Sequence, residues 1–229
     1  MNTTELFSLK GRVALVTGGS RGIGRMIAKG LLCQGARVYI TARKAAACDA
    51  TANELSAFGN CVSMPLDVST KEGIAQLVKQ LSEKEKHLDI LVNNAGAAWG
   101  APFDEFPEAG WDKVVDLNMK TPFFLTQALA PMLRLAAKNH MAKVINIASI
   151  DGISVNPWET YSYAASKAAV DQLAIAYWRS YNLPLVIVRP SNIFGPGQTT
   201  DKFIPKLIKS IQQGPPIELY ERNGEYEKR

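Results

Sequence analysis

Short apolar runs alternate along the chain with longer segments in which apolar residues recur at helical spacing. This alternation is typical of a parallel sheet covered by helices, because parallel strands are joined by long crossovers that helices supply. We therefore predict an α/β fold, a Rossmann-type doubly wound parallel sheet in three αβα layers. Its strands are expected at Val13 to Thr17, Arg37 to Thr41, Cys61 to Pro65, Leu88 to Asn93, Lys143 to Ile147 and Leu185 to Arg189.

The helices between these strands follow from the same periodicity. The fourth is expected to break before Pro122, since proline cannot donate the backbone hydrogen bond of a helix interior. The predicted helices are Gly22 to Gln34, Ala45 to Phe58, Lys71 to Lys84, Trp111 to Leu135 and Tyr161 to Tyr181. After the sixth strand the pattern changes, to an amphipathic helix over Phe203 to Gln213 and a tight hairpin turn at Asn223-Gly224.

Composition excludes several classes of function. A hydrophobic fraction of 47% and a charged fraction of 21% are ordinary for a globular protein. The net charge of +5 comes from basic residues scattered among acids, as in Ser82 to Lys86, so we expect no nucleic-acid partner. Met1 to Lys10 lacks a signal-peptide core and no run approaches the roughly 20 apolar residues of a membrane span. The expectation is a cytoplasmic protein with no membrane partner.

No metal site or disulfide framework is expected either. The three cysteines have no metal-like spacing, and the two histidines are isolated from one another. These residues are Cys33, Cys48, Cys61, His87 and His140.

A glycine-rich segment, Thr17 to Gly24, joins the first predicted strand to the first helix. Glycines let the backbone approach phosphates closely, and a helix N-terminus offers free N–H donors. The segment therefore predicts a dinucleotide site, and residues 1–229 are interpreted as one dinucleotide-binding domain whose segment 191–229 is atypical. The cofactor-binding residues expected here are Gly18, Ser20, Arg21, Gly22, Ile23 and Gly24.

The end of the second predicted strand carries no acid for a ribose 2′-hydroxyl. Arg43 follows this strand instead, and with Arg21 it could hold a 2′-phosphate through charge-assisted hydrogen bonds, which favours NADP(H). Asp67, followed by Val68, stands after the third strand and is a candidate acceptor for the adenine amino group. After the fourth strand, Asn93 to Gly96 leaves room for a flat ring or ribose, with Asn94, Ala95 and Gly96 as candidate cofactor-binding residues.

Tyr163 and Lys167 are spaced i and i+4, so they share one helix face. An ammonium near a phenol favours phenolate, which predicts a lowered pKa for Tyr163 and a proton donor and acceptor usable near neutral pH. Ser149 precedes the pair, just after the fifth strand. Tyr161 has Ala165 and not lysine at i+4, so it is interpreted as a pocket-wall or packing residue.

Together these motifs resemble the short-chain dehydrogenase/reductase family, whose compact branch is similar to residues 7 to about 173. The resemblance implies a catalytic tetrad of Asn118, Ser149, Tyr163 and Lys167. Tyr163 would protonate a carbonyl oxygen that Ser149 holds, Lys167 would bind the nicotinamide ribose, and Asn118 would support a water in the proton relay. It also implies cofactor contacts by Tyr163, Lys167, Pro190, Ser191 and Asn192.

Within the family, the segments Phe7 to Arg12 and Asn93 to Gly100 look most like NADP(H)-linked 3-oxoacyl reductases, including the rhamnolipid type. The resemblance implies reduction of a 3-oxoacyl carbonyl to a hydroxyl. An acyl substrate needs an apolar groove, whose candidate walls, equally plausible as core residues, are Trp99, Phe103, Ile150, Ile153 and Trp158.

From about residue 174 to 222 the sequence instead resembles the extended branch, the nucleotide-sugar dehydratases and epimerases, as in Arg189 to Gln198. The chain is thus interpreted as a hybrid, natural or engineered, that lacks the last strand of the compact branch. An edge left exposed at Leu185 to Val188 predicts a homo-oligomer. Two alternatives stay open: a dehydratase or epimerase that retains its coenzyme, and a coenzyme-binding scaffold without a competent substrate pocket.

Overall fold

The computed structural model describes residues 7–139, 141–154, 158–181, 185–189, 218–220 and 226–228. The chain divides into two compact units, residues 1–190 and 191–229. The interpretation of residues 1–229 as one domain stays a prediction. The six-stranded sheet and its helices belong to the first unit, and a two-stranded hairpin belongs to the second.

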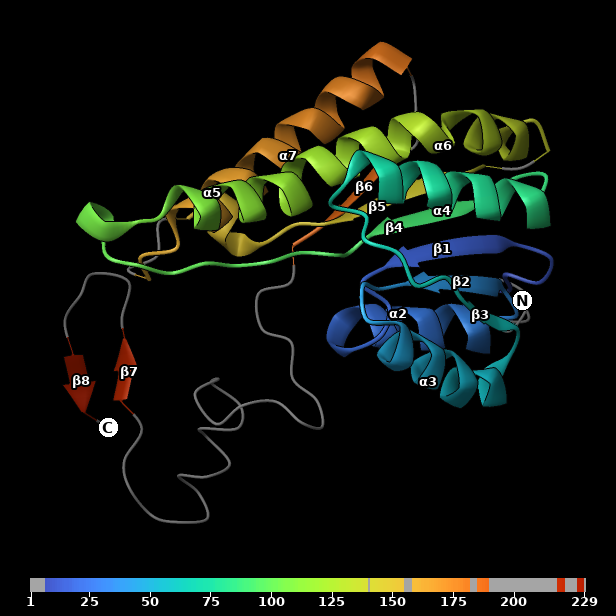
Figure 1. Cartoon of the computed structure of the whole chain (residues 1–229), viewed down its shortest axis with the longest axis horizontal. Coiled ribbons are helices and arrows are strands. Elements are labelled where there is room, and N and C mark those ends of the chain that lie inside the picture. The colour runs from blue at the N-terminus through green and yellow to red at the C-terminus, as the bar shows by residue number, and fades with distance from the viewer. Residues whose placement is uncertain are drawn as a thin grey trace. The chain divides into compact units, whose positions relative to one another are not determined.

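The first unit contains a six-stranded sheet in the order β3-β2-β1-β4-β5-β6, and every described pairing in it is parallel. This arrangement confirms the predicted Rossmann-type α/β fold. The chain crosses over between β3 and β4, so strands on either side of β1 come from different halves of the unit (Figure 1). The strands are β1 (Val13–Thr17), β2 (Arg37–Thr41), β3 (Cys61–Ser63), β4 (Ile90–Asn93), β5 (Lys143–Ile147) and β6 (Leu185–Val188).

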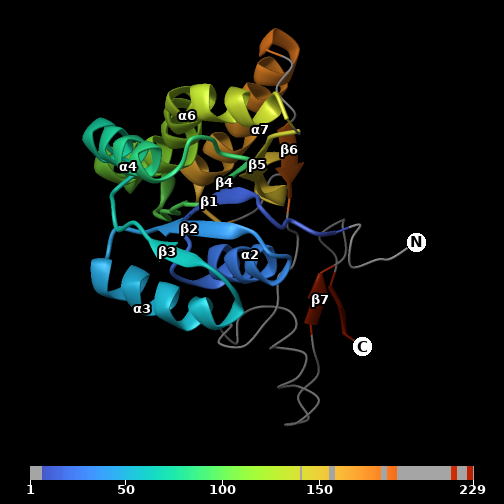
Figure 2. The same ribbon diagram turned by 90° about the vertical axis from the view of Figure 1, so that its right-hand side faces the viewer.

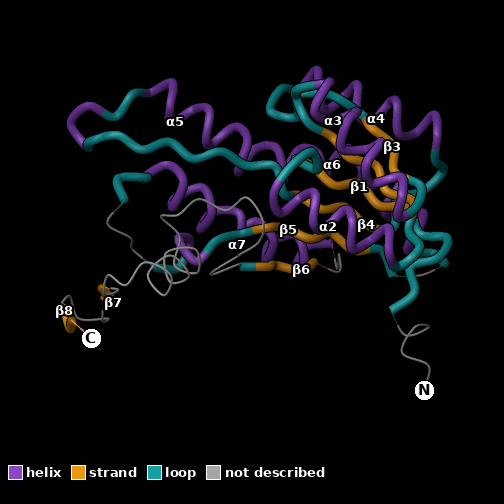
Figure 3. Tube along the Cα trace, turned by 90° about the horizontal axis from the view of Figure 1, so that it is seen from below, coloured by secondary structure: helices purple, strands orange, loops and turns teal. Residues whose placement is uncertain are grey.

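Helices cover both faces of this sheet. Seen along the layers, α2 and α3 lie on one face, and α4, α6 and α7 lie on the other (Figure 2). Seen from below, β5 and β6 run side by side in front of α7 (Figure 3). The helices are α2 (Gly22–Cys33), α3 (Ala45–Leu55), α4 (Lys71–Lys84), α5 (Glu108–Val115), α6 (Thr121–Ala137) and α7 (Tyr161–Tyr181).

Two apolar clusters hold these layers together. One packs Leu15 and Leu91 of the sheet against Leu77 and Leu129, which come from α4 and α6. The other packs Val16 and Ile40 against residues of α2 and α3. Alternate residues of β1 therefore serve opposite clusters, as expected for a strand buried on both faces. The carboxyl ends of the strands are thereby held on a rigid base.

Several predicted boundaries differ from the structure by one to three residues. The third strand ends at Ser63, the fourth begins at Ile90 and the sixth ends at Val188. The first helix ends at Cys33, while the second ends at Leu55 and continues as a 3₁₀ turn over Ser56–Phe58. Strand and helix ends fray into turns that apolar periodicity does not register.

The segment predicted as one broken helix, Trp111 to Leu135, begins earlier and holds an unusual turn. α5 starts at Glu108, and a π-helical turn over Asp116–Lys120 separates it from α6. Pro122 lies in the first turn of α6, where its missing N–H requires no partner. The predicted break before Pro122 is confirmed, and the π-helical turn gives it a definite geometry.

In the second unit, β7 (Glu218–Tyr220) pairs antiparallel with β8 (Tyr226–Lys228), and Tyr220 lies opposite Tyr226. The predicted hairpin pairing is confirmed. Its turn at Asn223-Gly224 and the predicted helix over Phe203 to Gln213 lie outside the described residues.

Candidate active site

The glycine-rich turn lies at the carboxyl end of β1 and leads directly into α2. Gly18 has a φ of 66°, a conformation that favours glycine. A Cβ on Gly24 would lie 2.3 Å from the Gly18 carbonyl oxygen and 2.5 Å from Nδ2 of Asn94. The turn is therefore a backbone cradle with no room for side chains at these two positions.

Two polar side chains brace this cradle against the β4 end. The Thr17 hydroxyl accepts hydrogen bonds from the backbone N–H groups of Asn94 and Ala95, both at 3.0 Å. Nδ2 of Asn94 donates to the carbonyl oxygens of Thr17 (2.9 Å) and Gly18 (3.3 Å). Asn94, predicted as a cofactor-binding residue, thus acts on the loop itself. No local sequence pattern identified Thr17 as its partner.

The N-terminus of α2 is open to an anion. Arg21 occupies the cap position but makes no side-chain cap, and the first turn holds no acidic residue. The predicted partners Arg21 and Arg43 are both exposed, and neither forms an ion pair within the described part of the chain. Backbone N–H donors and two unpaired guanidinium groups flank the cradle, and Ser20 and Ile23 lie within it.

The next two predicted positions divide between the site and the core. Oδ1 of Asp67 accepts from the backbone N–H (3.0 Å) and hydroxyl (2.7 Å) of Ser69. Val68 is buried in the core cluster beneath α4 and α6. Asn93 is also buried, and Nδ2 of Asn93 donates to Oδ1 of Asn146 and to the Thr126 hydroxyl. Its amide therefore supports the core, at the start of the segment Asn93 to Gly96 that is expected to leave room for a ring or ribose.

The Lys167 side chain is held in a fixed, buried position beside Tyr163. This side chain is almost wholly buried, and Nζ donates to the Ile147 carbonyl oxygen at 2.7 Å. The same Nζ lies 5.6 Å from the centre of the Tyr163 ring. A Cβ on Gly96 would lie 3.9 Å from Nζ, so the loop after β4 meets this side of α7. The predicted residues Tyr163, Lys167 and Gly96 are therefore brought together.

The predicted effect of the ammonium on Tyr163 is wrong for this structure. Burial raises the pKa of Tyr163 above its ordinary value, and the hydrogen bond with the Ser149 side chain lowers it by less. Burial also destabilises the ammonium of Lys167 and lowers its pKa to about 8, while the charge of Asp171 acts to raise it. Tyr163 is a protonated phenol at neutral pH, and its raised pKa makes it a weaker acid than an exposed tyrosine.

Ser149 and Asn118 have different partners in the site. The Ser149 hydroxyl accepts from the Asp151 backbone N–H and shares a hydrogen bond with Tyr163. Asn118 lies in the π-helical turn, where its Oδ1 accepts from the Ala97 N–H at 2.8 Å and its Nδ2 donates to the Ala97 carbonyl oxygen at 2.9 Å. Such turns concentrate at functional sites. The Asn118 side chain is used as a brace for the loop after β4.

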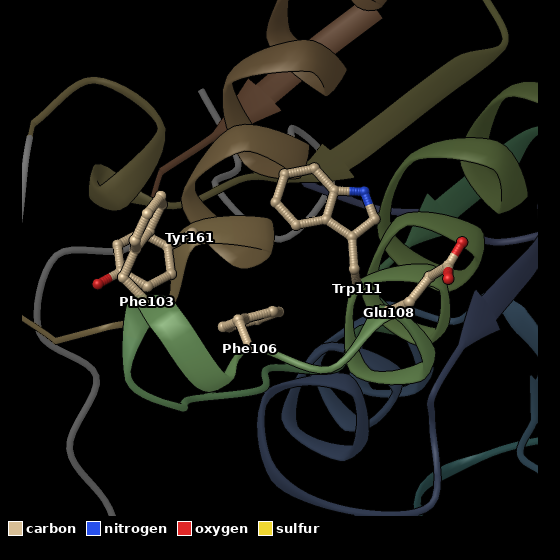
Figure 4. Close-up of a pocket in the computed structure, with 5 residues that line it drawn as sticks. All are labelled: Phe103, Phe106, Glu108, Trp111 and Tyr161. Carbon is tan, nitrogen blue, oxygen red and sulfur yellow. The ribbon is translucent and has the colours of Figure 1, made fainter.

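An aromatic pocket of about 300 Å³ opens beside the start of α7 (Figure 4). Tyr161 lies edge-to-face with Phe103 and Phe106, at centroid distances of 5.8 and 5.6 Å. The interpretation of Tyr161 as a wall residue is confirmed. The complete lining is Phe103, Phe106, Glu108, Trp111 and Tyr161.

Of the predicted wall residues, only Phe103 lines this pocket. Trp99 packs its ring on Gly110, where a Cβ would approach the ring to 2.8 Å. Ile150, Ile153 and Trp158 are 41%, 66% and 72% exposed, which excludes them from the core. Phe106 and Trp111 were missed, although their apolar character beside Phe103 was a usable signal.

Three predicted cofactor contacts lie outside the described residues: Pro190, Ser191 and Asn192. Within the residues that the structure describes, no cluster of three metal-ligating side chains occurs, and no helix is long and apolar enough to cross a membrane.

Comparisons with known proteins agree with this geometry. Residues 12–189 match the family described as short chain dehydrogenase, and residues 156–229 match the family described as GDP-mannose 4,6 dehydratase. The second match confirms the change of resemblance predicted for the C-terminal part of the chain.

Individual relatives share the first of these likenesses. The chain is 53% identical over 169 residues to the rhamnolipids biosynthesis 3-oxoacyl-[acyl-carrier-protein] reductase of Pseudomonas aeruginosa, covering 73% of this chain and 66% of that protein, just under two thirds. The Pseudomonas aeruginosa RhlG/NADP active-site complex superimposes with a TM-score of 0.78 at 46% identity, covering 83% of this chain and 76% of the other.

A third comparison points the same way. A metagenomic short-chain oxidoreductase in complex with NADP gives a TM-score of 0.72 at 36% identity, over 80% of this chain and 84% of the other. With its parallel sheet, its glycine cradle and a family match over residues 12–189, this chain belongs to the short-chain dehydrogenase family.

Proposed function

We propose that this protein is an NADP(H)-dependent reductase that converts a carbonyl, of the 3-oxoacyl type, to a hydroxyl with Asn118, Ser149, Tyr163 and Lys167. The observation that carries the proposal is the meeting of three groups at the carboxyl end of β5. Tyr163 is hydrogen-bonded to Ser149, and Lys167 is anchored on the Ile147 carbonyl oxygen beside it. A proton donor and a fixed cation side by side support acid catalysis on an oxygen atom.

The residues of the cradle fit a dinucleotide. A Cβ on Gly24 would clash with the cradle, so this position is kept free for close backbone packing, and the α2 N-terminus offers unbonded N–H groups for a pyrophosphate. When bound, the coenzyme supplies the hydride. Lys167 and the loop after β4 would orient its nicotinamide ribose near Tyr163.

Tyr163 is proposed as the proton donor. A phenol is protonated at neutral pH, so its hydroxyl has a proton to give to the carbonyl oxygen of the substrate, although burial raises its pKa and makes it a weaker acid in the free protein. Ser149, already hydrogen-bonded to the phenol, would hold that oxygen in place. Asn118 holds the Ala97 backbone in place with two hydrogen bonds. We propose that Asn118, in the π-helical turn, also supports the return of protons from solvent to the site.

NADP(H) is preferred to NAD(H) on charge. Arg21 and Arg43 flank the cradle, and no ion pair occupies either of them within the described residues. Two guanidinium groups suit a 2′-phosphate. Two structural neighbours, the Pseudomonas aeruginosa RhlG and a metagenomic short-chain oxidoreductase, are complexes with NADP, which supports the same choice for this chain.

The 3-oxoacyl class is supported by the name of the Pseudomonas aeruginosa relative and by the aromatic pocket beside the start of α7. Coenzyme titration by fluorescence, followed by NADPH oxidation with 3-oxoacyl thioesters and small ketones, tests the proposal. We expect tight NADPH binding and turnover of the thioesters. Binding of NADPH without turnover of any carbonyl would instead favour the scaffold interpretation, in which the substrate pocket is not competent.

The match of residues 156–229 to the dehydratase family favours one second candidate. A nucleotide-sugar dehydratase or epimerase keeps and regenerates its coenzyme, so conversion of GDP-, UDP- or dTDP-sugars without net NADPH oxidation would identify it. This result would replace the reductase proposal.

Self-association is proposed from the sheet edge. β6 pairs with β5 alone among the described strands, and Val186 and Val188 are about 40% exposed. An apolar edge strand tends to be covered by further chain or by another subunit. Light scattering that gives a homo-oligomer would support coverage by a second copy, and a clean monomer would contradict it.

A further inference from the structure

An ion pair between buried Asp171 and exposed Arg189 lies one helical turn beyond Lys167 and has no part in the proposed proton transfer. Nε and Nη2 of Arg189 both lie 2.7 Å from Oδ2 of Asp171. The Asp171 side chain is 5% exposed, and its other oxygen, Oδ1, is buried without a hydrogen-bond partner in the described part of the molecule. A carboxylate is costly to bury, so its retention here calls for a reason.

The sheet connects this pair to Lys167. Ile147, whose carbonyl oxygen holds Nζ of Lys167, lies opposite Val188 in the β5–β6 register. The Ala148 N–H donates to the Val188 carbonyl oxygen at 2.8 Å, and Arg189 is the next residue. Residues 167 and 171, on one face of α7, are therefore fastened to the ends of two adjacent strands.

Other charges near α7 are less able to act on Lys167. Asp171 is the one carboxylate that raises its pKa, against the lowering by burial. Asp151 acts on Tyr163, and Asp116 is paired with Lys120 in the π-helical turn. The charged groups on α5 are solvent-exposed and therefore screened; they are Glu108, Asp112 and Lys113.

We propose that Asp171 and Arg189 are a positioning pair for Lys167, which fixes the height of α7 on the sheet and sets the electrostatic field at the Lys167 ammonium. The carboxylate stabilises the ammonium from one turn away, and the guanidinium limits that stabilisation by sharing the same carboxylate. The inference rests on the proposed function for its catalytic meaning, but its physical content concerns the free protein.

Titration of Lys167 in the free protein tests the pair. Protein labelled with ¹³C at lysine Cε is followed by NMR over pH, and the Lys167 signal is the one lost in Lys167→Met. Asp171→Asn removes the stabilising charge, so the midpoint should fall by about one pH unit. Arg189→Met leaves the carboxylate uncompensated, so the midpoint should move upward. Opposite shifts from the two halves of one pair are not expected of a purely structural contact.

A second ion pair serves as the matched control. Asp89 is as buried as Asp171 and is paired with Arg12 at 3.2 Å, but it lies beside the amino end of β4. Asp89→Asn should lower the melting temperature and leave the Lys167 midpoint unchanged. Arg189→Lys keeps a cation and should restore the wild-type midpoint, which provides the test if Arg189→Met does not fold.

The proposed role of the pair is refuted if the Lys167 midpoint is unchanged in Asp171→Asn. It is also refuted if a folded Arg189→Lys protein shifts the Lys167 midpoint upward, as expected for loss of the cation. Failure of the reductase proposal is seen separately, because the wild-type protein would then oxidise no NADPH with any carbonyl while the NMR titration stays interpretable.

Discussion

The two sides of the site are built by different physical means. At the coenzyme side, Thr17 and Asn94 hold a glycine turn by hydrogen bonds directed at the backbone, and the turn has no space for a side chain at Gly24. At the catalytic side, Lys167 and Asp171 are charged groups that are more than nine-tenths buried. Shape defines the first side, and desolvated charge defines the second.

The difference determines how each side should fail. A side that depends on shape is damaged by added volume and is indifferent to pH. A side that depends on buried charge is damaged by changes in protonation, and it costs stability even when intact.

Tyr163→Phe should reduce carbonyl turnover by about 10³-fold, within the range that a positioned acid contributes. The phenyl ring keeps the packing and removes only the hydroxyl that hydrogen-bonds to Ser149. NADPH affinity, measured by fluorescence titration, should stay within about twofold of wild type. Tyr161→Phe is the matched control, since Tyr161 lines the aromatic pocket, and its turnover should far exceed that of Tyr163→Phe. Equal losses in the two variants would remove Tyr163 from the proposed role.

Lys167→Met should change how stability depends on pH. The folded pKa of about 8 lies below the ordinary lysine value of 10.5, so the buried ammonium destabilises the wild type at pH 7 and this penalty disappears as pH rises from 8 to 10.5. Relative to the variant, the wild type should therefore gain about 3 kcal/mol across that window. Urea unfolding at several pH values measures the difference. Lys44→Met, at an exposed lysine, should run parallel to wild type.

Gly24→Ala should destabilise the fold by about 2 kcal/mol and weaken NADPH binding, because the new Cβ meets the Gly18 carbonyl oxygen. Gly30→Ala is the matched control in the same helix, where nothing lies within 4 Å of the added Cβ. That variant should be stabilised by up to about 1 kcal/mol, as expected for alanine in a helix. Chemical denaturation of both variants makes the comparison. A Gly24→Ala protein as stable as Gly30→Ala would mean that the cradle is looser than its geometry indicates.

The fold was predicted well from the sequence where a helix cap or the spacing of residues within one helix determines the geometry. The bounds of α4 match the prediction, and Thr70 caps it by accepting a hydrogen bond from the Gly73 N–H. The i, i+4 spacing of Tyr163 and Lys167 likewise predicted their common face. These features involve residues a few positions apart, whose geometry the helix itself sets.

Features that depend on burial or on strand register could not be predicted. The pKa of Tyr163 moves opposite to the expected direction because burial raises it by more than the Ser149 hydrogen bond lowers it, and burial is a property of the folded chain. The Asp171–Arg189 pair joins residues 18 apart and requires the β5–β6 register to exist. Asn93 begins the segment expected to leave room for a ring or ribose, and the alternation of β4 turns its side chain into the core.

Arg43→Ala should produce the smallest effect, and one confined to the coenzyme side. If Arg43 binds a 2′-phosphate, its loss should weaken NADPH binding by about tenfold, equivalent to about 1.4 kcal/mol, and leave NADH binding unchanged. Arg43 is exposed and has no ion partner among the described residues, so the melting temperature should not move. Arg25→Ala is the control, because Arg25 is also exposed but pairs with Glu54. Fluorescence titration with both coenzymes separates the cases. An equal loss of NADPH and NADH affinity in Arg43→Ala would show that the arginine acts on the cradle's shape and not on a phosphate, and the charge-based preference for NADP(H) would then have no support from this residue.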